Sequence, residues 1–287
     1  MYGVQSSVAT LQRVAVRRPD AMLRADHVRW HYAHPLDAER VLAQHDRFVD
    51  LLEAHGCDVV WMPDDADDLA DSVFTYDPSF VVGSGAVVLR PGKELRRGEA
   101  DLHAAFYGEH GIPVLGRIIA PGTVEGGDCF FLDEHTLAVG RGFRTNQVGI
   151  DQLSSILGPV GVDVIVYDLP FHQGPEACLH LLSLISPLAD DLALVHAPLL
   201  PTALHQALTA RGVTLLAAPA VEFTASGGLN LNVLATAPRR LISVEGFPAT
   251  LALLRSAGCE VDTFPGDELC VACEGGPTCL TRPLLRA

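Results

Sequence analysis

The chain has 287 residues, of which 48% are hydrophobic and 19% are charged, a balance typical of a compact folded protein. Its formal net charge of −15 argues against a nucleic acid as a partner, because phosphate backbones bind basic surfaces. No apolar run reaches the roughly 18 residues that a membrane-spanning helix needs, so we expect no membrane partner.

The cysteine content and the N-terminus bear on the cellular compartment. Seven cysteines are an odd number, which a closed disulfide framework would not use. Residues 1–8 lack the basic start and the apolar run of a signal peptide. We therefore expect a cytoplasmic protein with free thiols. Lys93 is the only lysine, which argues against chemistry based on a lysine Schiff base or a lysine general base.

A three-part phrase recurs five times: an amphipathic helical pattern, a glycine suited to the left-handed end of a helix, and a short β-rich run. The expected helices span 36–55, 94–110, 147–157, 204–211 and 248–257. The stop glycines are Gly56, Gly111, Gly158, Gly212 and Gly258, and the strands that follow them span 57–63, 112–119, 162–170, 213–219 and 259–265. Further strands are expected at 72–74, 80–89, 129–132, 136–139, 229–237 and 241–245.

The period of this phrase indicates the architecture. Consecutive stop glycines are 46 to 55 residues apart, a regular spacing typical of a radial or stacked array. A doubly wound nucleotide-binding sheet would need about one strand per helix, and no Gly-x-Gly-x-x-Gly follows an early strand. We therefore predict an α/β fold of five ββαβ repeats around a pseudo-fivefold axis, a five-bladed α/β propeller. No linker divides the chain, so residues 1–287 are expected to form one domain.

Four short polar phrases are candidates for the central site on which the blades of such an array converge. Each phrase alone has an ordinary explanation: an acidic turn, a turn before a proline, a hydrogen-bonded core histidine or an inert packed thiol. The phrases are Glu125-Gly-Gly-Asp128, Phe74-Thr-Tyr-Asp77-Pro78 with Asp71 upstream, Cys178-Leu-His180, and Gly275-Gly-Pro-Thr-Cys279.

Together these phrases suit covalent chemistry on a cation. A thiol after a glycine-rich turn can be exposed as a nucleophile, and histidine is the side chain best suited to exchange protons near neutral pH. Carboxylates beside a thiol normally raise its pKa and weaken it as a reagent. They make sense if the substrate is itself a cation, because the carboxylates would hold it and its charge would favour the thiolate.

A zinc site is a second interpretation of the C-terminal cysteines. Cys270, Cys273 and Cys279 could supply three thiolate ligands. A fourth ligand at a suitable spacing is missing and no second Cys-x-x-Cys occurs, so we expect no metal and no cofactor. The zinc-binding interaction module remains an alternative that metal analysis of the purified protein would detect.

Seven motifs carry a family resemblance through their combination and order. They are Val73-Phe-Thr-Tyr-Asp77, Leu89-Arg-Pro-Gly92, Glu125-Gly-Gly-Asp128, Arg144-Thr-Asn146, Leu179-His-Leu181, Asn232-Val-Leu234 and Gly276-Pro-Thr-Cys279. In this order they resemble the guanidino-group-modifying superfamily, the pentein fold of arginine deiminases, amidinotransferases and dimethylarginine dimethylaminohydrolases. The resemblance covers almost the whole chain and is nearest to the dimethylarginine dimethylaminohydrolases.

The resemblance implies a role for each candidate residue, with a small guanidino compound as substrate. Cys279 matches the nucleophile, His180 the general acid/base, Glu125 and Asp77 the carboxylates that engage the guanidinium, Arg90 and Arg144 the arginines that face the substrate carboxylate, and Asp71 an acidic position near the substrate's amino end. Tyr76 and Asp128 are also expected to border the substrate.

Two departures from the family pattern bear on the substrate. Tyr76 stands where the dimethylarginine-specific enzymes carry a glutamate, and Leu182 stands where arginine deiminases and amidinotransferases use an aspartate. The resemblance implies hydrolysis to an amine or ammonia and a ureido product such as citrulline. An amidinotransferase, an arginine-deiminase-type enzyme on another guanidine, and a non-catalytic pentein binding protein remain alternatives. A homodimer is compatible with the sequence.

Overall fold

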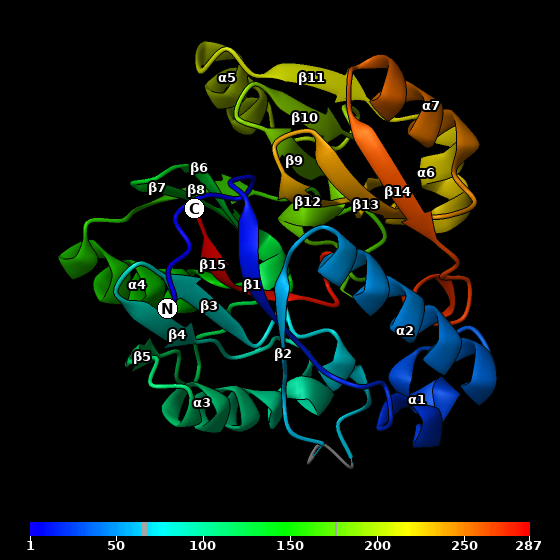
Figure 1. Ribbon diagram of the computed structural model, residues 1–287. Coiled ribbons are helices and arrows are strands. Elements are labelled where there is room, and N and C mark those ends of the chain that lie inside the picture. Colours follow the sequence, from blue (N-terminus) through cyan, green and yellow to red (C-terminus); the bar gives the residue numbers. More distant parts are fainter. Residues whose placement is uncertain (65–67, 176) are drawn as a thin grey trace.

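The computed structural model describes residues 1–64, 68–175 and 177–287, and its strands form five separate three-stranded sheets. In each sheet the middle strand pairs antiparallel with one neighbour and parallel with the other. A helix forms the crossover between the two parallel strands, which makes each unit a ββαβ repeat (Figure 1). The predicted five-bladed α/β propeller is thereby confirmed.

The blades have closely similar dimensions. Their strands are β15 (Arg282–Arg286), β1 (Leu11–Val16) and β2 (Asp58–Trp61); β3 (Ser79–Val82), β4 (Gly85–Val88) and β5 (Val114–Arg117); β6 (Cys129–Asp133), β7 (Thr136–Arg141) and β8 (Asp163–Asp168); β9 (Ile185–Ala189), β10 (Leu192–Val195) and β11 (Thr214–Ala217); β12 (Leu234–Ala237), β13 (Arg240–Val244) and β14 (Glu260–Phe264). The crossover helices are α2 (Ala38–Ala54), α3 (Glu99–Glu109), α4 (Gln147–Leu157), α5 (Thr202–Ala210) and α7 (Pro248–Ser256), while α1 (His27–Trp30) and α6 (Ala220–Ser226) lie in connections.

The two ends of the chain complete one blade together. The last strand, β15, pairs antiparallel with β1, so that Val14 lies opposite Pro283. The amide of Gly3 also donates to the carbonyl of Leu284 at 2.8 Å. Both termini therefore lie on the same side of the molecule (Figure 1). This closure draws the segment before β15, which contains Cys279, into the centre of the ring.

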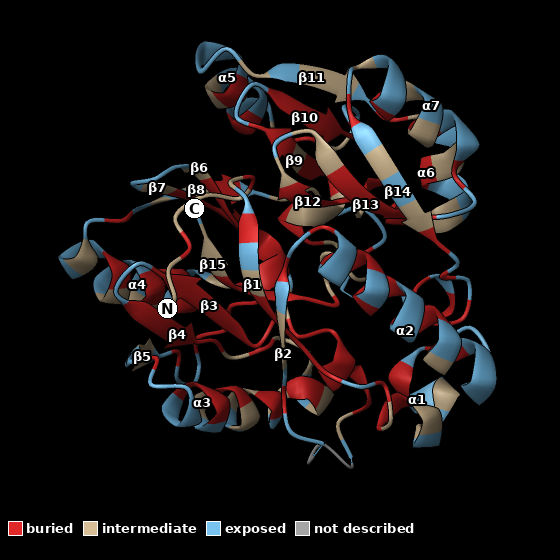
Figure 2. Cartoon of the chain, in the orientation of Figure 1, coloured by how far each residue is buried: buried red, intermediate tan, exposed pale blue. Residues whose placement is uncertain are grey.

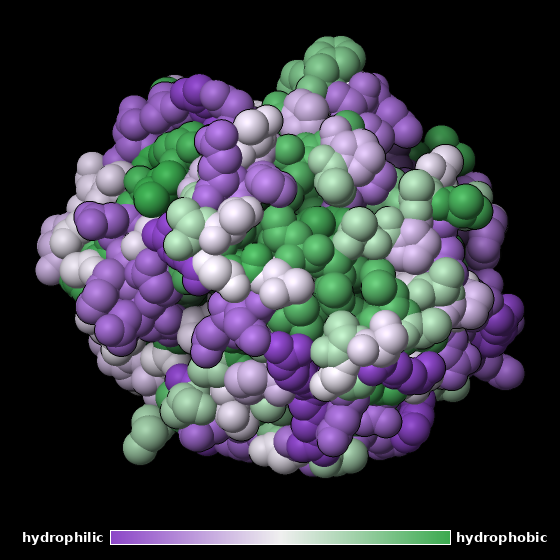
Figure 3. Space-filling view, turned by 90° about the horizontal axis from the view of Figure 1, so that it is seen from above, coloured by the Kyte–Doolittle hydropathy of each residue, from purple (hydrophilic) through white to green (hydrophobic). Residues whose placement is uncertain are grey.

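Burial separates the inner strands from the outer ones (Figure 2). The strand that begins each blade is largely buried, and two such strands contact each other directly in the pairs β9–β12 and β15–β3. The outermost strands β2, β5 and β11 have exposed ends. One face of the molecule gathers apolar side chains at its centre and hydrophilic ones around them (Figure 3). The segments that precede the inner strands therefore meet near the axis.

The predicted helices agree well with the observed ones, and one stop glycine is wrong. Helix α4 spans the expected residues 147–157 and starts where the Asn146 side chain accepts a hydrogen bond from the amide of Gly149 at 2.8 Å. Gly158 has a right-handed φ of −54°, because Pro159 continues the chain into a further 3₁₀ turn, Gly158–Val160. Gly161, with a φ of 80°, is the left-handed stop.

Three other expected elements differ from the structure. The short strand expected at 72–74 is a 3₁₀ helix, Ala70–Val73, because a brief apolar run carries no period that separates strand from helix. The run 80–89 is two strands, β3 and β4, joined at Gly85 with a φ of 154°. The run 229–237 begins with a 3₁₀ turn, Leu229–Leu231, before β12. None of the described helices is both long enough and apolar enough to cross a membrane.

Candidate active site

The same position of each blade supplies polar side chains to the centre. In each case the side chain stands just before the inner strand of its blade, where the chain enters the sheet at the axis. These residues are Asp77 before β3, Glu125 and Asp128 before β6, His180 before β9, Asn232 before β12, and Cys279 before β15. The fivefold repeat thus explains how residues 200 positions apart in sequence form one site.

His180 and Glu125 form a short buried contact. Nε2 of His180 lies 2.5 Å from Oε2 of Glu125, and the Glu125 side chain is fully buried. The other oxygen of Glu125 accepts hydrogen bonds from the Lys93 amide at 3.1 Å and from Nη1 of Arg144 at 3.2 Å. A carboxylate so surrounded by donors stays ionised, and it fixes the orientation of the imidazole ring.

Asp77 is paired with a buried arginine. Nη1 of Arg96 lies 2.6 Å from Oδ2 of Asp77, and the amide of Gly127 donates to Oδ1 at 2.8 Å. The same guanidinium pairs with Glu99 at 2.8 Å and donates to the carbonyl of Phe74 at 2.9 Å. Arg96 therefore holds the loop before β3 in place and carries one positive charge against two carboxylates.

Asp128 supports the site from behind. Its carboxylate accepts hydrogen bonds from the Thr145 hydroxyl at 2.6 Å and from the amide of Leu181 at 2.9 Å. Leu181 follows His180 directly, and the Thr145 oxygen accepts in turn from the amide of Glu125 at 3.1 Å. Burial raises the pKa of Asp128 to about 6, against the opposing effects of His180 and Thr145. This residue links the backbones that carry Glu125 and His180.

Gly127 packs directly against the His180 ring, and a side chain there would displace it. A Cβ on Gly127 would lie 2.4 Å from Nδ1 and 2.7 Å from Cγ of His180. We expect Gly127→Ala to push the imidazole out of contact with Glu125 and to lower kcat by roughly 10²-fold, the scale of a misplaced acid–base group. Steady-state rates beside a thermal melt test this, and Gly158→Ala, where nothing lies within 4 Å, is the control. A Gly127→Ala protein with normal kcat would contradict it.

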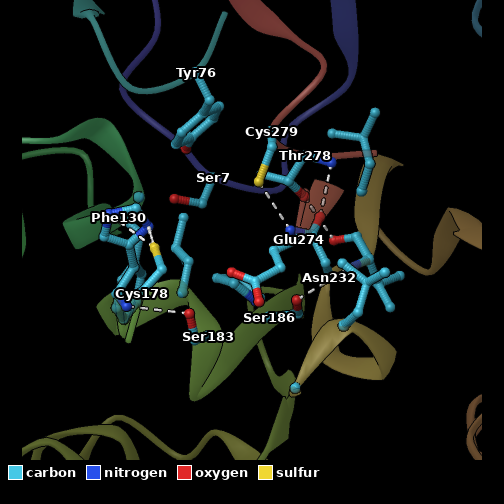
Figure 4. A pocket seen from close by; sticks show the side chains of 18 of the residues that line it. Ser7, Tyr76, Phe130, Cys178, Ser183, Ser186, Asn232, Glu274, Thr278 and Cys279 are labelled. Atoms are coloured by element: carbon cyan, nitrogen blue, oxygen red, sulfur yellow. Dashed lines mark hydrogen bonds between the residues drawn. The ribbon is translucent and has the colours of Figure 1, made fainter. Parts of the chain in front are cut away.

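Among the described residues, the Cys279 thiol has one polar side chain as a hydrogen-bond partner. Nδ2 of Asn232 donates to Sγ of Cys279 at 3.0 Å, and Oδ1 of Asn232 accepts from the amide of Thr278 at 3.0 Å (Figure 4). A Cβ on Gly276 would lie 2.5 Å from the Asn232 amide carbon, so this turn requires glycine. The Asn232 amide orients the thiol and can donate to a thiolate.

Two cavities meet at Cys279 and His180. One has a volume of about 300 Å³ and is lined by charged residues. The other, of about 390 Å³, reaches the same two residues from another side, and its wall includes Tyr76, Phe130 and Ser186 (Figure 4). The charged residues of the smaller cavity are Asp71, Asp77, Lys93, Arg96, Arg144 and Glu274, beside His180. The smaller cavity has the size and the charges for a small ionic ligand.

Four of the predicted site residues do not line the smaller cavity. Glu125 does not occur among the described residues that line either cavity, because its buried carboxylate faces His180, the Lys93 amide and Arg144. Among the described residues that line the two cavities, Arg90 does not occur, and its Nη1 donates to the carbonyl of Gly122 at 3.1 Å. Asp128 lines neither cavity, because its oxygens face Thr145 and Leu181. Tyr76 lines only the larger cavity, where the Arg282 guanidinium stacks 4.2 Å from the ring centroid. Asp71 lines the smaller cavity, and its oxygens are taken by Tyr32 and Lys93.

Sequence reasoning missed several residues that line the cavities or complete the site. Asn232 stood in a quoted motif and occupies the repeat position of the other site residues, so the repeat itself could have assigned it. Lys93 is the only lysine, and from the sequence it served only as an argument against lysine-based catalysis. Cys178 belongs to the phrase Cys178-Leu-His180 but was given no role of its own. Arg96 and Glu274 carried no local signal that marks them as residues of the cavity.

The zinc interpretation lacks structural support in the described part of the chain. All seven cysteines are free, and the one set of three suitable side chains whose ligand atoms lie within 4.8 Å of one another is Asp77, Glu125 and His180. Cys270, Cys273 and Cys279 do not form such a set. Asp77 and Glu125 already face the guanidiniums of Arg96 and Arg144. Both carboxylates are therefore paired with arginines of the protein itself.

The ionisation of His180 and Glu125 follows from their surroundings. Burial alone lowers the pKa of His180, but Cys178, Asp77 and Glu125 together raise this pKa well above its usual range. Burial raises the pKa of Glu125, whereas His180, Arg144 and Arg96 outweigh it and hold this pKa below the usual range. The resting pair is therefore an imidazolium beside a carboxylate.

The thiol is a weak nucleophile while the cavity is empty. Burial and, next, Asp77 raise the pKa of Cys279, against the opposing effects of Gly276, Asn232 and His180. We expect the alkylation rate of Cys279 by neutral iodoacetamide to rise about tenfold per pH unit between pH 7 and 9, following the thiolate fraction. Peptide mass spectrometry identifies the labelled cysteine. A rate that is flat across this range would contradict the raised pKa.

The chain is similar in sequence and in fold to several known proteins. The model of the arginine deiminase family matches residues 64–211. An N(G),N(G)-dimethylarginine dimethylaminohydrolase of Streptomyces coelicolor is 34% identical over 188 residues, which cover 66% of this chain and 69% of that protein. A solved dimethylarginine dimethylaminohydrolase adduct with 4-chloro-2-hydroxymethylpyridine superposes with a TM-score of 0.76 at 25% identity over 97% of this chain and 100% of its own. The amidinotransferase SxtG of Microseira wollei has a TM-score of 0.81 at 18% identity over 99% and 97% of the two chains, which shows the shared fold.

Proposed function

The chain belongs to the arginine deiminase family, within the guanidino-group-modifying superfamily of pentein fold, and on this premise we propose that it is a cysteine-dependent hydrolase of a small guanidino compound. The proposed products are an amine or ammonia and a ureido compound such as citrulline. The observation that carries the proposal is that His180 and Cys279 line the same cavity, while Nε2 of His180 lies 2.5 Å from the buried carboxylate of Glu125.

In the first half of the proposed reaction, the guanidinium enters the smaller cavity and its nitrogens face Glu125 and Asp77. Its positive charge favours loss of the Cys279 proton to solvent, which offsets the raised pKa of the thiol. The thiolate then adds to the guanidino carbon, and protonated His180 gives its proton to the departing nitrogen as the carbon–nitrogen bond breaks. The amine leaves and an amidino group remains bound to Sγ.

In the second half, neutral His180 takes a proton from water, and the water oxygen adds to the amidino carbon. The carbon–sulfur bond breaks, the remaining hydroxyl proton passes to the sulfur as the carbonyl forms, and the ureido product and the free thiol result. Glu125 stabilises the imidazolium in both halves, because the two groups stay in contact. Asn232 donates to the sulfur whenever it carries negative charge.

Arg144 and Arg96 already occupy the two carboxylates that a substrate guanidinium would bind. Arg144 already contacts Glu125 at 3.2 Å, and Arg96 contacts Asp77 at 2.6 Å. A substrate guanidinium must therefore compete with Arg144 for Glu125. We propose that Arg144 then turns to an anionic group of the substrate, which its planar donor fork suits. Because the reacting groups come from five blades, we also propose that residues 1–287 act as one catalytic domain.

A panel of guanidino compounds tests the proposed reaction. Arginine, its methylated forms and shorter guanidino acids are incubated with the protein, and the released amine or ammonia and the ureido product are quantified together. Equal amounts of both products support hydrolysis. Turnover of no compound in the panel would reject the proposal and revive the non-catalytic binding protein.

An amidinotransferase remains the second candidate, because one observation favours it. The cavity of about 390 Å³ reaches Cys279 and His180 from another side and has room for an acceptor amine. Added amines then compete with water for the amidino group. A guanidinylated amine formed at the expense of the ureido product would assign the chain to this class.

A further inference from the structure

The only lysine of the chain lies in the wall of the smaller cavity. Lys93 follows β4 in the segment Leu89-Arg-Pro-Gly-Lys93, and its side chain is 18% exposed. A Cβ on Gly92 would lie 2.6 Å from the carbonyl oxygen of Arg144, so this segment packs closely against the neighbouring loop. The amide of Lys93 donates to Glu125 at 3.1 Å. These contacts hold the residue firmly beside the proposed catalytic carboxylate.

The Lys93 ammonium uses two of its three hydrogens within the protein. Nζ lies 2.7 Å from Oδ2 of Asp71 and 3.1 Å from the carbonyl oxygen of Trp30. It also lies 5.0 Å from the centroid of the Trp30 ring, a cation–π distance. No third acceptor for it occurs among the described residues. One N–H thus remains for a ligand in the cavity.

Asp71 is not free to bind a substrate ammonium. Its Oδ1 accepts from the Tyr32 hydroxyl at 2.9 Å, and its Oδ2 faces the Lys93 ammonium. A resident ammonium therefore occupies the place that the family resemblance assigns to the amino end of the substrate. Because the Lys93 ammonium lies beside the cavity, it favours a ligand with an acidic group there.

Arg90 is not placed to bind an acidic group of the ligand. It faces the Gly122 carbonyl and lines neither cavity in the described part of the chain. The cations of the smaller cavity are Lys93, Arg96, Arg144 and the protonated His180, whose Nε2 faces Glu125. Arg96 pairs with Asp77 and Glu99, and its side chain is only 5% exposed. Lys93 is therefore the cation with a donor to spare, beside Arg144.

We propose that Lys93 binds an acidic group of the substrate, so that the substrates are guanidino carboxylic acids whose α-ammonium group is dispensable. This inference rests on the proposed hydrolysis of a guanidino compound and narrows its substrate class. Lys93 is a specificity-determining residue in this account. Lys93 lowers the KM of substrates that carry a carboxylate and has little influence on the rate of guanidino hydrolysis.

Three compounds that differ by one charged group measure the effect: arginine, its des-amino analogue 5-guanidinopentanoic acid, and its decarboxylated analogue agmatine, or the same triad at whichever chain length the wild type prefers. Wild-type kcat/KM should fall on loss of the carboxylate and change little on loss of the amino group. Lys93→Met should raise KM for both acids by about 10- to 100-fold, the worth of one charge-assisted hydrogen bond, with kcat nearly constant. Lys93→Arg should retain the preference for acids.

Asp71 provides a matched control. In Lys93→Met the Asp71 carboxylate loses its ammonium partner and keeps the Tyr32 hydroxyl, with Nε of Arg96 at 4.0 Å, so it should attract the ammonium of agmatine and lower the KM of that compound. Lys93→Met combined with Asp71→Asn should lose affinity for the acids without gaining affinity for agmatine. An unchanged ratio of kcat/KM between acid and agmatine in Lys93→Met would overturn the proposal.

Calorimetric binding of the same three compounds to Cys279→Ala separates this inference from the proposed function. If no compound is turned over but acids bind through Lys93, the hydrolase proposal fails and the Lys93 site stands. If turnover occurs and binding ignores the charge at position 93, the hydrolase stands and the Lys93 site fails.

Discussion

Replacing Cys279 with serine is expected to lower turnover of a guanidino substrate by at least about 10³-fold while the fold stays intact. The hydroxyl is a far weaker nucleophile at neutral pH than a thiol whose proton is lost on binding of a cation. Replacing the sulfur with an oxygen changes the volume of the side chain little. The contact with Asn232, at 3.0 Å from Sγ, can be kept. Rates of ureido product formation by both proteins, measured beside circular dichroism and thermal melts, check the expectation.

Cys259→Ser is the matched control for this change. Cys259 is a free, buried cysteine in a hydrophobic cluster and lines neither cavity in the described part of the chain. The control should keep its rate and lose some stability, because a hydroxyl replaces a buried thiol. Normal turnover by Cys279→Ser would remove the nucleophile from the account.

Loss of the proton-transfer pair is the second large effect. His180→Gln should lower kcat by roughly 10²- to 10⁴-fold, because neither the departing nitrogen nor the attacking water then has a proton-transfer partner. In the wild type, the raised pKa of His180 means that its acid form is lost only as pH rises through that pKa. Activity should therefore persist on the alkaline side of neutrality and decline at higher pH.

Glu125→Gln tests the cause of that pH dependence. Removing the carboxylate takes away an anion that raises the pKa of His180, so the alkaline limb of the kcat profile should move to lower pH. Profiles of kcat against pH for the wild type and the variant measure the movement. An alkaline limb at the same pH in both proteins would mean that His180 is not the titrating acid.

The repeat made most of the fold predictable from the sequence. Five helices and the strands that follow them were expected close to their observed bounds, because amphipathic periods and glycine stops are local signals. Gly158 failed as a stop, since Pro159 allows another turn and moves the left-handed residue to Gly161. The expected strand at 72–74 failed, since a run of only three residues has no readable period.

The candidate site was predictable where chemistry and chain position coincide, and not where charges pair over long distances. Cys279, His180, Glu125 and Asp77 all stand before inner strands, so their convergence follows from the blade repeat. Whether Asp71 faces a ligand or a resident ammonium depends on Lys93, which lies in another segment. Arg90 shows the same limit, because its Gly122 partner comes from a different loop. Partner choice of this kind is a property of the packed structure.

The covalent intermediate offers the most direct test of the central claim. The wild type and His180→Gln are mixed with the guanidino compound that is turned over best, quenched in acid within one turnover, and digested for peptide mass spectrometry. The account predicts an amidino group on the peptide that contains Cys279 in the wild type, and slower formation of the same adduct in His180→Gln, because the departing nitrogen loses its proton donor. Turnover without any adduct on Cys279, or with the adduct on another residue, would contradict it.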